Sequence, residues 1–523
     1  MPACYLFIFL FEPDRLWKIY LFLSQVFLAN MKKLFVLVSF ALFLPYVEAA
    51  ERKNTSTDVQ TIQQAPAGFW GVFSQVPEPG ERPTGGKEMA KQMNIAPAEV
   101  EMESAGTISA HQKTELPTDW QAAIHLAINR HPSIASSIAT LESAGFNIDA
   151  ASAGYLPAIK AGITSGRQED EGRGQIATIG LSQMLYDFGK TGSAVDQANA
   201  KFLRQQATVL SQIDTIVQQT ALALNEVYRY TQLVDNADKQ INALRDILKL
   251  TQMRAAAGAS TRVDPVQAQA RVEAAESQRQ EMEIKLQQEK YHLQSLLGQQ
   301  TAHIKLSAPL DLLPLIKQQN TRLDLNKNPS LLIAQADAAI AQAELRNYKA
   351  QRYPTLSLEA SANKYVGDIA DHQSRSQYQN LYLSLNSTLY QGGALVAQES
   401  ASARALEAAK ATIASKKLEL ADQQRNYFQS VIGLQRNIKV LTSRMNTITE
   451  TRALYREQYL SLGTRNVLDL LNAEQEIGRA EQDLINARRD LWASSVNYIV
   501  LAGMARDVFN LNNQVIQGLR LSQ

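Results

Sequence analysis

The sequence predicts a mixed α/β membrane protein that is mainly α-helical and that contains an internal twofold repeat. Two proline-free stretches of nearly seventy residues carry heptad spacing, which is typical of long coiled-coil helices. Two pairs of segments alternate strictly between apolar and polar residues, as β-hairpins do. Motifs of the first half recur 197 to 205 residues later. Each chain therefore offers four strands among long helices, arranged as two copies of one plan.

The composition excludes several classes of function. The 52 Lys and Arg residues balance 51 Asp and Glu residues, so the concentrated basic surface that nucleic-acid binding needs is missing. The single cysteine, Cys4, excludes a disulfide framework and a cysteine-based zinc site. The six histidines form no HExxH pair, and the sequence contains no Walker-type phosphate loop. We therefore expect a protein that is not an enzyme and that needs neither a metal nor a cofactor.

The first 49 residues have the features of an export signal rather than of a folded domain. Met31 is followed by two lysines and an apolar run, and small residues then predict cleavage after Ala49. We expect residues 1–30 to be an over-extended start and residues 31–49 to be the signal peptide; the alternative is a membrane anchor that includes the earlier apolar runs. No cysteine follows the signal, so we expect no lipid anchor. Residues 50–115 are expected to form an extended or disordered arm.

The repeat appears in motifs that keep their register. His131-Pro132-Ser133-Ile134 recurs as Asn328-Pro329-Ser330-Leu331, and Gly258 recurs as Gly463. The two shifts differ by eight residues, which places one insertion in the second copy. The predicted organisation is a first repeat at 116–307 with a hairpin at 157–187 and a helix turn at 258, a linker at 308–325, a second repeat at 326–506 with a hairpin at 354–391 and a helix turn at 463, and a C-terminal tail at 507–523.

The alternating segments predict strands with one apolar and one polar face. Ile159, Ala161 and Ile163 alternate with polar or small residues, and the other three segments follow the same rule. These strands could belong to a soluble sheet, but helical rods around isolated hairpins leave no obvious partner sheet. In lipid, an open sheet edge leaves backbone groups unpaired, and four strands are too few to close a barrel. At least two copies must then share one barrel, and three would give twelve strands.

Long helices follow each hairpin and end at glycines. Heptad steps are seen at Val234, Ala237, Ile241, Leu244 and Leu248, and at Leu441, Met445, Ile448, Tyr455, Tyr459 and Leu462. At about 1.5 Å per residue, each helix would be a rod of roughly 100 Å. The glycines at 258 and 463 end these rods, and an aspartate lies in the opening turn of each returning helix, where it favours the helix dipole. Two shorter helices placed end to end would match one rod in length.

The duplicated plan of helix, hairpin, long helix, turn and helix resembles the TolC family of trimeric outer membrane efflux and secretion channels. The resemblance covers about residues 118–510. It rests on the His-Pro and Asn-Pro helix starts and on three further motifs: Leu185-Tyr186-Asp187-Phe188-Gly189, Leu389-Tyr390-Gln391-Gly392-Gly393 and Leu462-Gly463-Thr464-Arg465. Each motif is weak alone, but their duplication in this order is specific.

The resemblance implies a homotrimer with a twelve-stranded outer membrane β-barrel, four strands per chain, continued by a periplasmic α-helical coiled-coil barrel. Such a protein is a passive exit duct in a tripartite export system, gated at its periplasmic tip. Its partners would be a periplasmic adaptor protein and an inner-membrane transporter of the ABC or proton-driven kind. We favour type I protein secretion over small-molecule efflux. The alternative function is a non-conducting periplasmic coiled-coil scaffold or an adhesin stalk.

The resemblance also implies site residues near the two helix turns. An arginine, a tyrosine and an aspartate hold the gate shut in this family; Arg465 and Asp264 match, whereas Leu460 occupies the tyrosine position beside Tyr459. Asp469 matches the first of two acidic rings, and Asn472 replaces the second carboxylate, which predicts weaker cation binding. The expected adaptor-docking residues are Gly258, Leu462 and Gly463. As alternatives, Asp264 and Asp469 could be ordinary helix-start residues, and Arg465 a solvated turn charge.

Overall fold

The computed structural model describes residues 119–168, 172–298, 306–319, 325–367, 376–462, 465–512 and 514–521. The chain divides into two units, Met1–Gly80 and Glu81–Gln523, and all the described residues belong to the second. The predicted start region, signal peptide and N-terminal arm lie outside the described residues, and so does Gly463.

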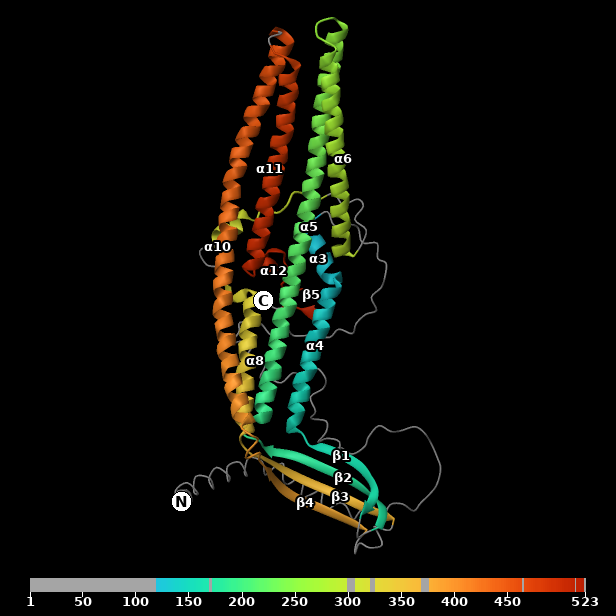
Figure 1. Ribbon diagram of the computed structural model, residues 1–523, viewed down its shortest axis with the longest axis vertical. Helices are drawn as coiled ribbons and strands as arrows, with labels where there is room; N and C mark the ends of the chain where they lie inside the picture. Colours follow the sequence, from blue (N-terminus) through green and yellow to red (C-terminus); the bar gives the residue numbers. More distant parts are fainter. Residues whose placement is uncertain are drawn as a thin grey trace. The chain divides into compact units, whose positions relative to one another are not determined.

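Helices account for most of the described chain (Figure 1). The elements are α3 (Trp120–Arg130), α4 (Pro132–Ser152), η3 (Ala153–Tyr155), β1 (Ala158–Gln168), β2 (Gly172–Tyr186), α5 (Lys190–Ala256), α6 (Val263–Leu297), α7 (Leu313–Gln319), η4 (Leu325–Lys327), α8 (Pro329–Gln351), β3 (Thr355–Gly367), β4 (Gln377–Asn386), α10 (Ala394–Glu457), η5 (Gln458–Leu462), α11 (Val467–Leu501), α12 (Ala505–Val508), β5 (Val515–Ile516) and β6 (Leu519–Arg520). The long helices α5 and α10 contain 67 and 64 residues and confirm the predicted rods.

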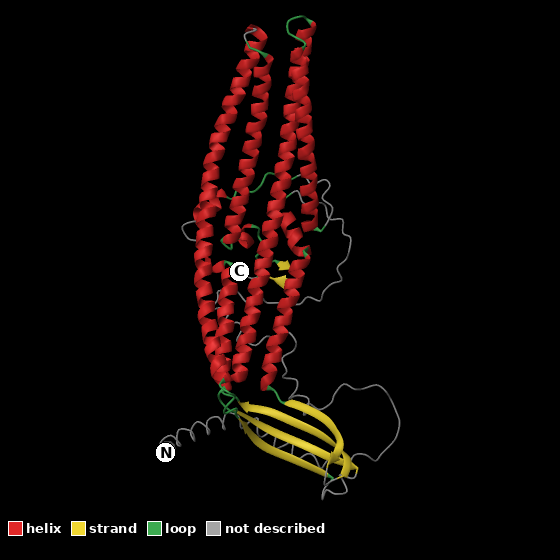
Figure 2. Ribbon diagram, in the orientation of Figure 1, coloured by secondary structure: helices red, strands yellow, loops and turns green. Residues whose placement is uncertain are grey.

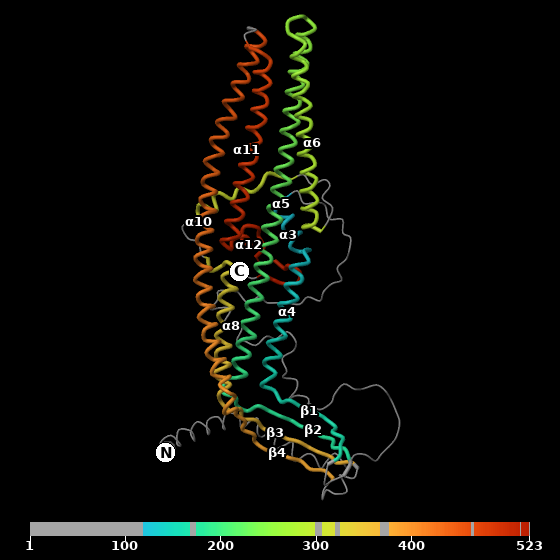
Figure 3. The backbone as a smooth tube through the Cα atoms, in the orientation of Figure 1, coloured from blue at the N-terminus to red at the C-terminus, as the bar shows by residue number. Residues whose placement is uncertain are grey.

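Shorter helices pack along the long ones. Along α5, helices α3 and α4 occupy one part of its length and α6 another (Figure 3). Helix α10 contacts α8 and α11 in the same manner, and α5 also contacts α8 and α11. The expectation that two shorter helices match one rod is therefore confirmed. None of the helices within the described residues combines the length and the apolar character needed to cross a membrane.

The first turn of α4 and that of α8 are capped in the same way. His131 accepts a hydrogen bond at Nδ1 from the Ser133 amide, and Asn328 accepts one at Oδ1 from the Ser330 amide. Proline occupies the first helical position in both helices, where its missing N–H costs nothing. His131 is thus a helix-capping residue, which satisfies an otherwise unpaired amide.

The four longer strands form one antiparallel sheet in the order β1-β2-β3-β4 (Figure 2). The two predicted hairpins are present, and β2 also pairs with β3, so that the hairpins form a single sheet. Paired positions carry matching polarity: Ile159 pairs with Leu181, which pairs with Ala360, which pairs with Leu381. The next row contains Lys160, Gly180, Ser361 and Asn380. The sheet therefore has one apolar and one polar face, as the alternation predicted.

The main hydrophobic core joins α3, α4, α5 and α11 to the C-terminal residues. Trp120 and Trp492 meet edge to face with ring centroids 4.5 Å apart, and their indole N–H groups donate to the carbonyls of Ser307 and Leu310. The predicted C-terminal tail is part of this core: Phe509 is fully buried, and Gln517 donates to two carbonyls near the junction of α3 and α4. Through these contacts, the first helix of the described chain, α3, and its C-terminal residues pack in the same core.

The buried carboxylate of Asp214 connects α5 to this C-terminal region. Its Oδ2 atom lies 3.2 Å from Arg506 of α12, whereas its Oδ1 atom has no hydrogen-bond partner among the described residues. Burial raises the pKa of Asp214 from 3.8 to about 6; Arg506 lowers this pKa and Asp507 raises it. The folded chain therefore binds this proton more tightly than the unfolded chain does.

We expect the stabilising contribution of protonated Asp214 to the free energy of unfolding to be complete below pH 3.8 and to be lost as the pH rises through about 6. Asp214→Asn should remove this loss, so that the variant gains stability relative to the wild type between pH 4 and pH 7. Thermal unfolding followed by circular dichroism across this range measures the difference. Asp337→Asn, which alters an exposed ion pair, is the matched control. Identical pH profiles for Asp214→Asn and the wild type would contradict the assignment.

Candidate functional site at the helix turns

The turn between α5 and α6 is built around Gly258. This residue has φ of +70°, and a Cβ atom added there would contact nothing within 4 Å. The amide of Gly258 donates to the carbonyl of Ala255, and the amide of Ala259 donates to that of Arg254. This is a Schellman ending, in which glycine supplies the left-handed backbone. Gly258 therefore shapes the backbone at this turn. The corresponding Gly463, and the side chain of Leu462, lie outside the described residues.

Arg465 is bound within its own helical hairpin. Its Nε donates to Gln458 Oε1 over 3.0 Å, its Nη1 lies 3.4 Å from Asp469 Oδ2, and its guanidinium lies 4.5 Å from the centre of the Tyr455 ring. Asp264 lies on the other hairpin, in the first turn of α6. The described residues thus show Arg465 paired with Asp469, and not with Asp264. Both members of this pair are about 40% exposed, so the pair contributes little to stability.

Tyr459 is one of the residues that connect the two hairpins at this end. It belongs to the π-helical turn η5 after α10, and it is 4% exposed. The Arg254 guanidinium, from the last turn of α5, donates to the Tyr459 carbonyl over 2.9 Å and lies 4.6 Å from its ring centre. Leu460, the residue at the predicted tyrosine position, is 48% exposed. The side chain buried between the hairpins is therefore that of Tyr459, next to the predicted position, and not that of Leu460.

Tyr459 belongs to the same core cluster as apolar residues of three helices. Its other buried members are Ile241, Leu244, Ile247, Ala268, Val272, Ala275, Val467, Leu470 and Leu471. Burial raises the pKa of Tyr459, while Arg254 lowers it and Asp264 raises it again. Tyr459 Oη and Arg254 Nε are buried without a hydrogen-bond partner among the described residues. The contact between the hairpins thus depends on the ring, the carbonyl and the guanidinium, because the hydroxyl forms no bond there.

Of the two residues in this contact, the sequence pattern indicated Tyr459 but not Arg254. The heptad seam through Tyr455 and Tyr459 marked the tyrosine as a residue facing a neighbouring helix. No pattern distinguished Arg254 from other basic residues near a helix C-terminus. Because its partner comes from the other hairpin, 205 positions away, only the fold identifies it.

The two positions expected to form acidic rings lie one helical turn apart on α11. Asp469 is half-buried beside Arg465, and Asn472 is exposed. Further along the same helix, Glu474 is buried and pairs with Arg452 of α10 over 2.9 Å. Within the described ranges there is no group of three or more His, Cys, Asp or Glu side chains that could hold a metal ion.

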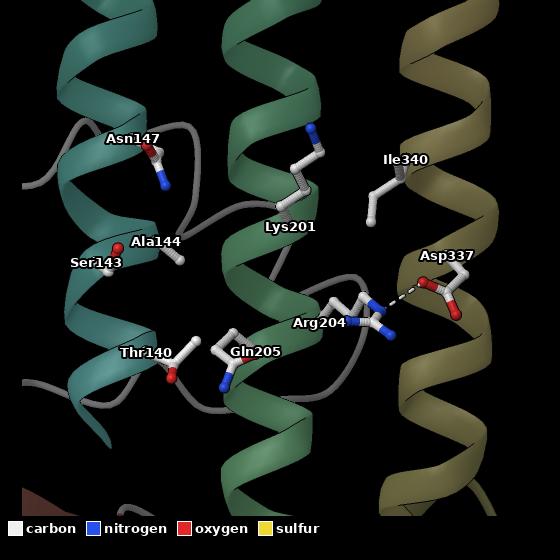
Figure 4. A pocket seen from close by; sticks show the side chains of 9 residues that line it. All are labelled: Thr140, Ser143, Ala144, Asn147, Lys201, Arg204, Gln205, Asp337 and Ile340. Carbon is white, nitrogen blue, oxygen red and sulfur yellow. Dashed lines mark hydrogen bonds and ion pairs between the residues drawn. The ribbon is translucent and has the colours of Figure 1, made fainter. Parts of the chain in front are cut away.

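An open groove lies apart from these turns, among α4, α5 and α8 (Figure 4). Its lining residues are Thr140, Ser143, Ala144, Asn147, Lys201, Arg204, Gln205, Asp337 and Ile340. Arg204 and Asp337 form an exposed ion pair across it, with Nε and Oδ1 2.7 Å apart. The groove contains neither a histidine nor a cysteine, and we assign it no chemistry.

Comparison with known proteins identifies the class to which this fold belongs. The sequence model of the family described as "Outer membrane efflux protein" matches residues 123–299 and 322–503. The chain therefore belongs to the outer membrane efflux protein family, and the resemblance to the TolC family is confirmed. The chain is accordingly an outer membrane protein.

Two curated relatives extend this comparison. The chain is 24% identical over 331 residues to the alkaline protease secretion protein AprF of Pseudomonas aeruginosa, covering 60% of this chain and 66% of the relative. It is 23% identical over 417 residues to the outer membrane protein TolC of Escherichia coli K12, covering 73% of this chain and 82% of the relative.

Two solved structures have the same fold. The outer membrane protein VceC of Vibrio cholerae superposes with a TM-score of 0.65 at 19% sequence identity, covering 73% of this chain and 96% of the other. CusC superposes with a TM-score of 0.64 at 14% identity and covers 81% of this chain. At such identities the likeness establishes the fold alone.

Proposed function

We propose that three copies of this chain form the outer membrane exit duct of a tripartite export system. The observation that carries this proposal is the four-stranded sheet, which has one apolar face and whose edge strands, β1 and β4, each pair on one side only within the described residues. In a membrane, both edges need backbone partners, and a neighbouring copy supplies them without any other protein. Three copies give a closed wall of twelve strands with its apolar face toward lipid.

The helices continue this duct in the proposal. The order of helix, two strands, long helix and returning helix occurs in residues 132–297 and again in 329–501, and the family match falls in two segments of similar length. This supports a twofold structural repeat. With three chains, the long helices would form a coiled-coil barrel across the periplasm. The helix turns at 258 and 463 would then be its periplasmic tips.

The proposed partners are a periplasmic adaptor protein and an inner-membrane transporter of the ABC or proton-driven kind. We propose that the adaptor docks at Gly258, Leu462 and Gly463. The proposed gate residues are Asp264, Leu460, Arg465, Asp469 and Asn472, to which we add Arg254 and Tyr459. The cargo we favour is a protein, in line with the name of the relative AprF, an alkaline protease secretion protein. The duct itself moves cargo passively.

Conductance tests the proposal against a non-conducting scaffold or adhesin stalk. Purified protein should migrate as heat-modifiable trimers from outer membrane fractions and should conduct ions in planar lipid bilayers. A soluble monomer that produces no conductance at any protein concentration would instead support the scaffold.

Asp469 gives a prediction about ion selectivity. We expect Asp469→Ala to reduce the preference for cations and to weaken block by multivalent cations, because a ring of three carboxylates attracts cations to a constriction. Asn472→Asp should strengthen the block, since it restores a second ring one turn away. Reversal potentials and block by a trivalent cation in planar bilayers measure both effects, and Asn472→Ala is the control. Unchanged block in Asp469→Ala would remove this residue from the constriction.

A further inference from the structure

The polar face of the sheet carries few charges. Apart from Ile176 and Met184, its members are small or polar; they include Lys160, Gly162, Thr164, Thr178, Gly180, Ser182, Glu359, Ser361, Asn363, Asn380 and Tyr382. Among the strand residues whose side chains the structure describes, Lys160 and Glu359 are the charged ones on this face. Arg167 and Lys364 lie on the opposite face.

Lys160 and Glu359 are placed on neighbouring rows of the same face. Glu359 pairs with Ser182 and with Tyr382, whereas the row of Lys160 passes through Gly180 and Ser361, two residues further along β3. At about 3.3 Å per residue, the two rows lie roughly 7 Å apart along the strands. Strand β2 separates the two side chains, and the described residues show no ion pair between them.

The Glu359 carboxylate is held in position. Tyr382 Oη donates to its Oε2 atom over 3.2 Å, and the Ser357 hydroxyl donates to its Oε1 atom over 3.4 Å. Lys160 is exposed on its strand. The face thus presents one fixed negative charge and one exposed positive charge per chain.

We propose that Lys160 and Glu359 set the ion selectivity of the membrane end of the duct. This inference rests on the proposed function, in which the polar face lines a water-filled lumen. Three chains place three lysines and three carboxylates in two adjacent rings, whose separation is comparable to the Debye length of about 10 Å at 0.1 M salt. The rings therefore compensate each other. Removal of one ring leaves the other to attract its counterions into the lumen.

Reversal potentials in planar bilayers under a potassium chloride gradient test this inference. Lys160→Gln should shift the reversal potential toward cation selectivity, and Glu359→Gln should shift it in the opposite direction. The double variant should return it toward the wild-type value. Lys364→Gln removes the same charge from the apolar face and should cause no shift. At 1 M salt, where the Debye length is about 3 Å, the shifts should shrink.

The outcomes separate this inference from the function on which it rests. Wild-type protein that does not conduct would overturn the proposed duct. Conducting variants with wild-type reversal potentials, or shifts no larger than that of Lys364→Gln, would overturn the role of the two residues alone. Lys160→Gln and Glu359→Gln test the inference independently of each other. The reversal potential of either variant is therefore enough for the test, provided that this variant assembles as a heat-modifiable trimer.

Discussion

Arg254→Met should open the periplasmic tip. The guanidinium of Arg254 joins the first hairpin to the carbonyl and ring of Tyr459 in the second, and methionine keeps the apolar stem while it removes the charge. The partly buried charged hydrogen bond and the cation–π contact disappear together. We expect larger single-channel conductance in planar bilayers, and cells that become sensitive to antibiotics too large for the intact outer membrane.

Tyr459→Phe provides the matched control for this prediction. Phenylalanine retains the ring and the backbone carbonyl and removes only the buried hydroxyl, which has no hydrogen-bond partner among the described residues. The gate should therefore stay closed in this variant. If Arg254→Met conducted as the wild type does, or if both variants opened equally, the contact between Arg254 and Tyr459 would not hold the tip closed.

Trp120→Ala should cause the largest loss of stability. Trp120 is 1% exposed, contacts Trp492 and Tyr228, and donates its indole N–H to the Ser307 carbonyl. Replacing a buried tryptophan with alanine typically costs about 3–5 kcal/mol, because a large cavity remains. The midpoint of thermal unfolding should fall markedly. Trp120→Phe, which keeps an aromatic ring against Trp492, should lose much less. Equal midpoints for Trp120→Ala and the wild type would contradict this account of the core.

The features that depend on local pattern could be predicted from the sequence. Heptad spacing and the absence of proline predicted α5 and α10, and strict alternation predicted the four strands with their two faces. Pairing between β2 and β3 could not be derived in this way, since it joins residues such as Leu181 and Ala360 that are far apart in sequence. The packing of residues 505–521 against α3 likewise depends on contacts across almost the whole described chain.

In the candidate site, too, features set by local sequence could be predicted, and features set by contacts between distant residues could not. The role of Gly258 as the end of the long helix could be predicted from the sequence. Helices commonly end at a residue with left-handed backbone angles, and glycine adopts these angles most easily. The choice between Tyr459 and Leu460 could not be settled by alignment with a motif. The π-helical turn η5 changes which side chains face the first hairpin, and it buries Tyr459 while Leu460 faces outward.

Disulfide crosslinking between β1 of one chain and β4 of the next tests most directly whether neighbouring chains share one sheet. The single native cysteine, Cys4, is replaced with serine in every variant, so that no other thiol competes. Cysteines at Ile159, Ala161 or Ile163 are combined with one at Leu383, because all four positions lie on the apolar face. For at least one combination, oxidation should yield covalent dimers and trimers in outer membranes. Pairs with a cysteine at Tyr382, on the polar face, should not crosslink, because the Cβ atoms point apart. Protein that remains monomeric with every same-face pair would contradict a barrel shared among identical chains.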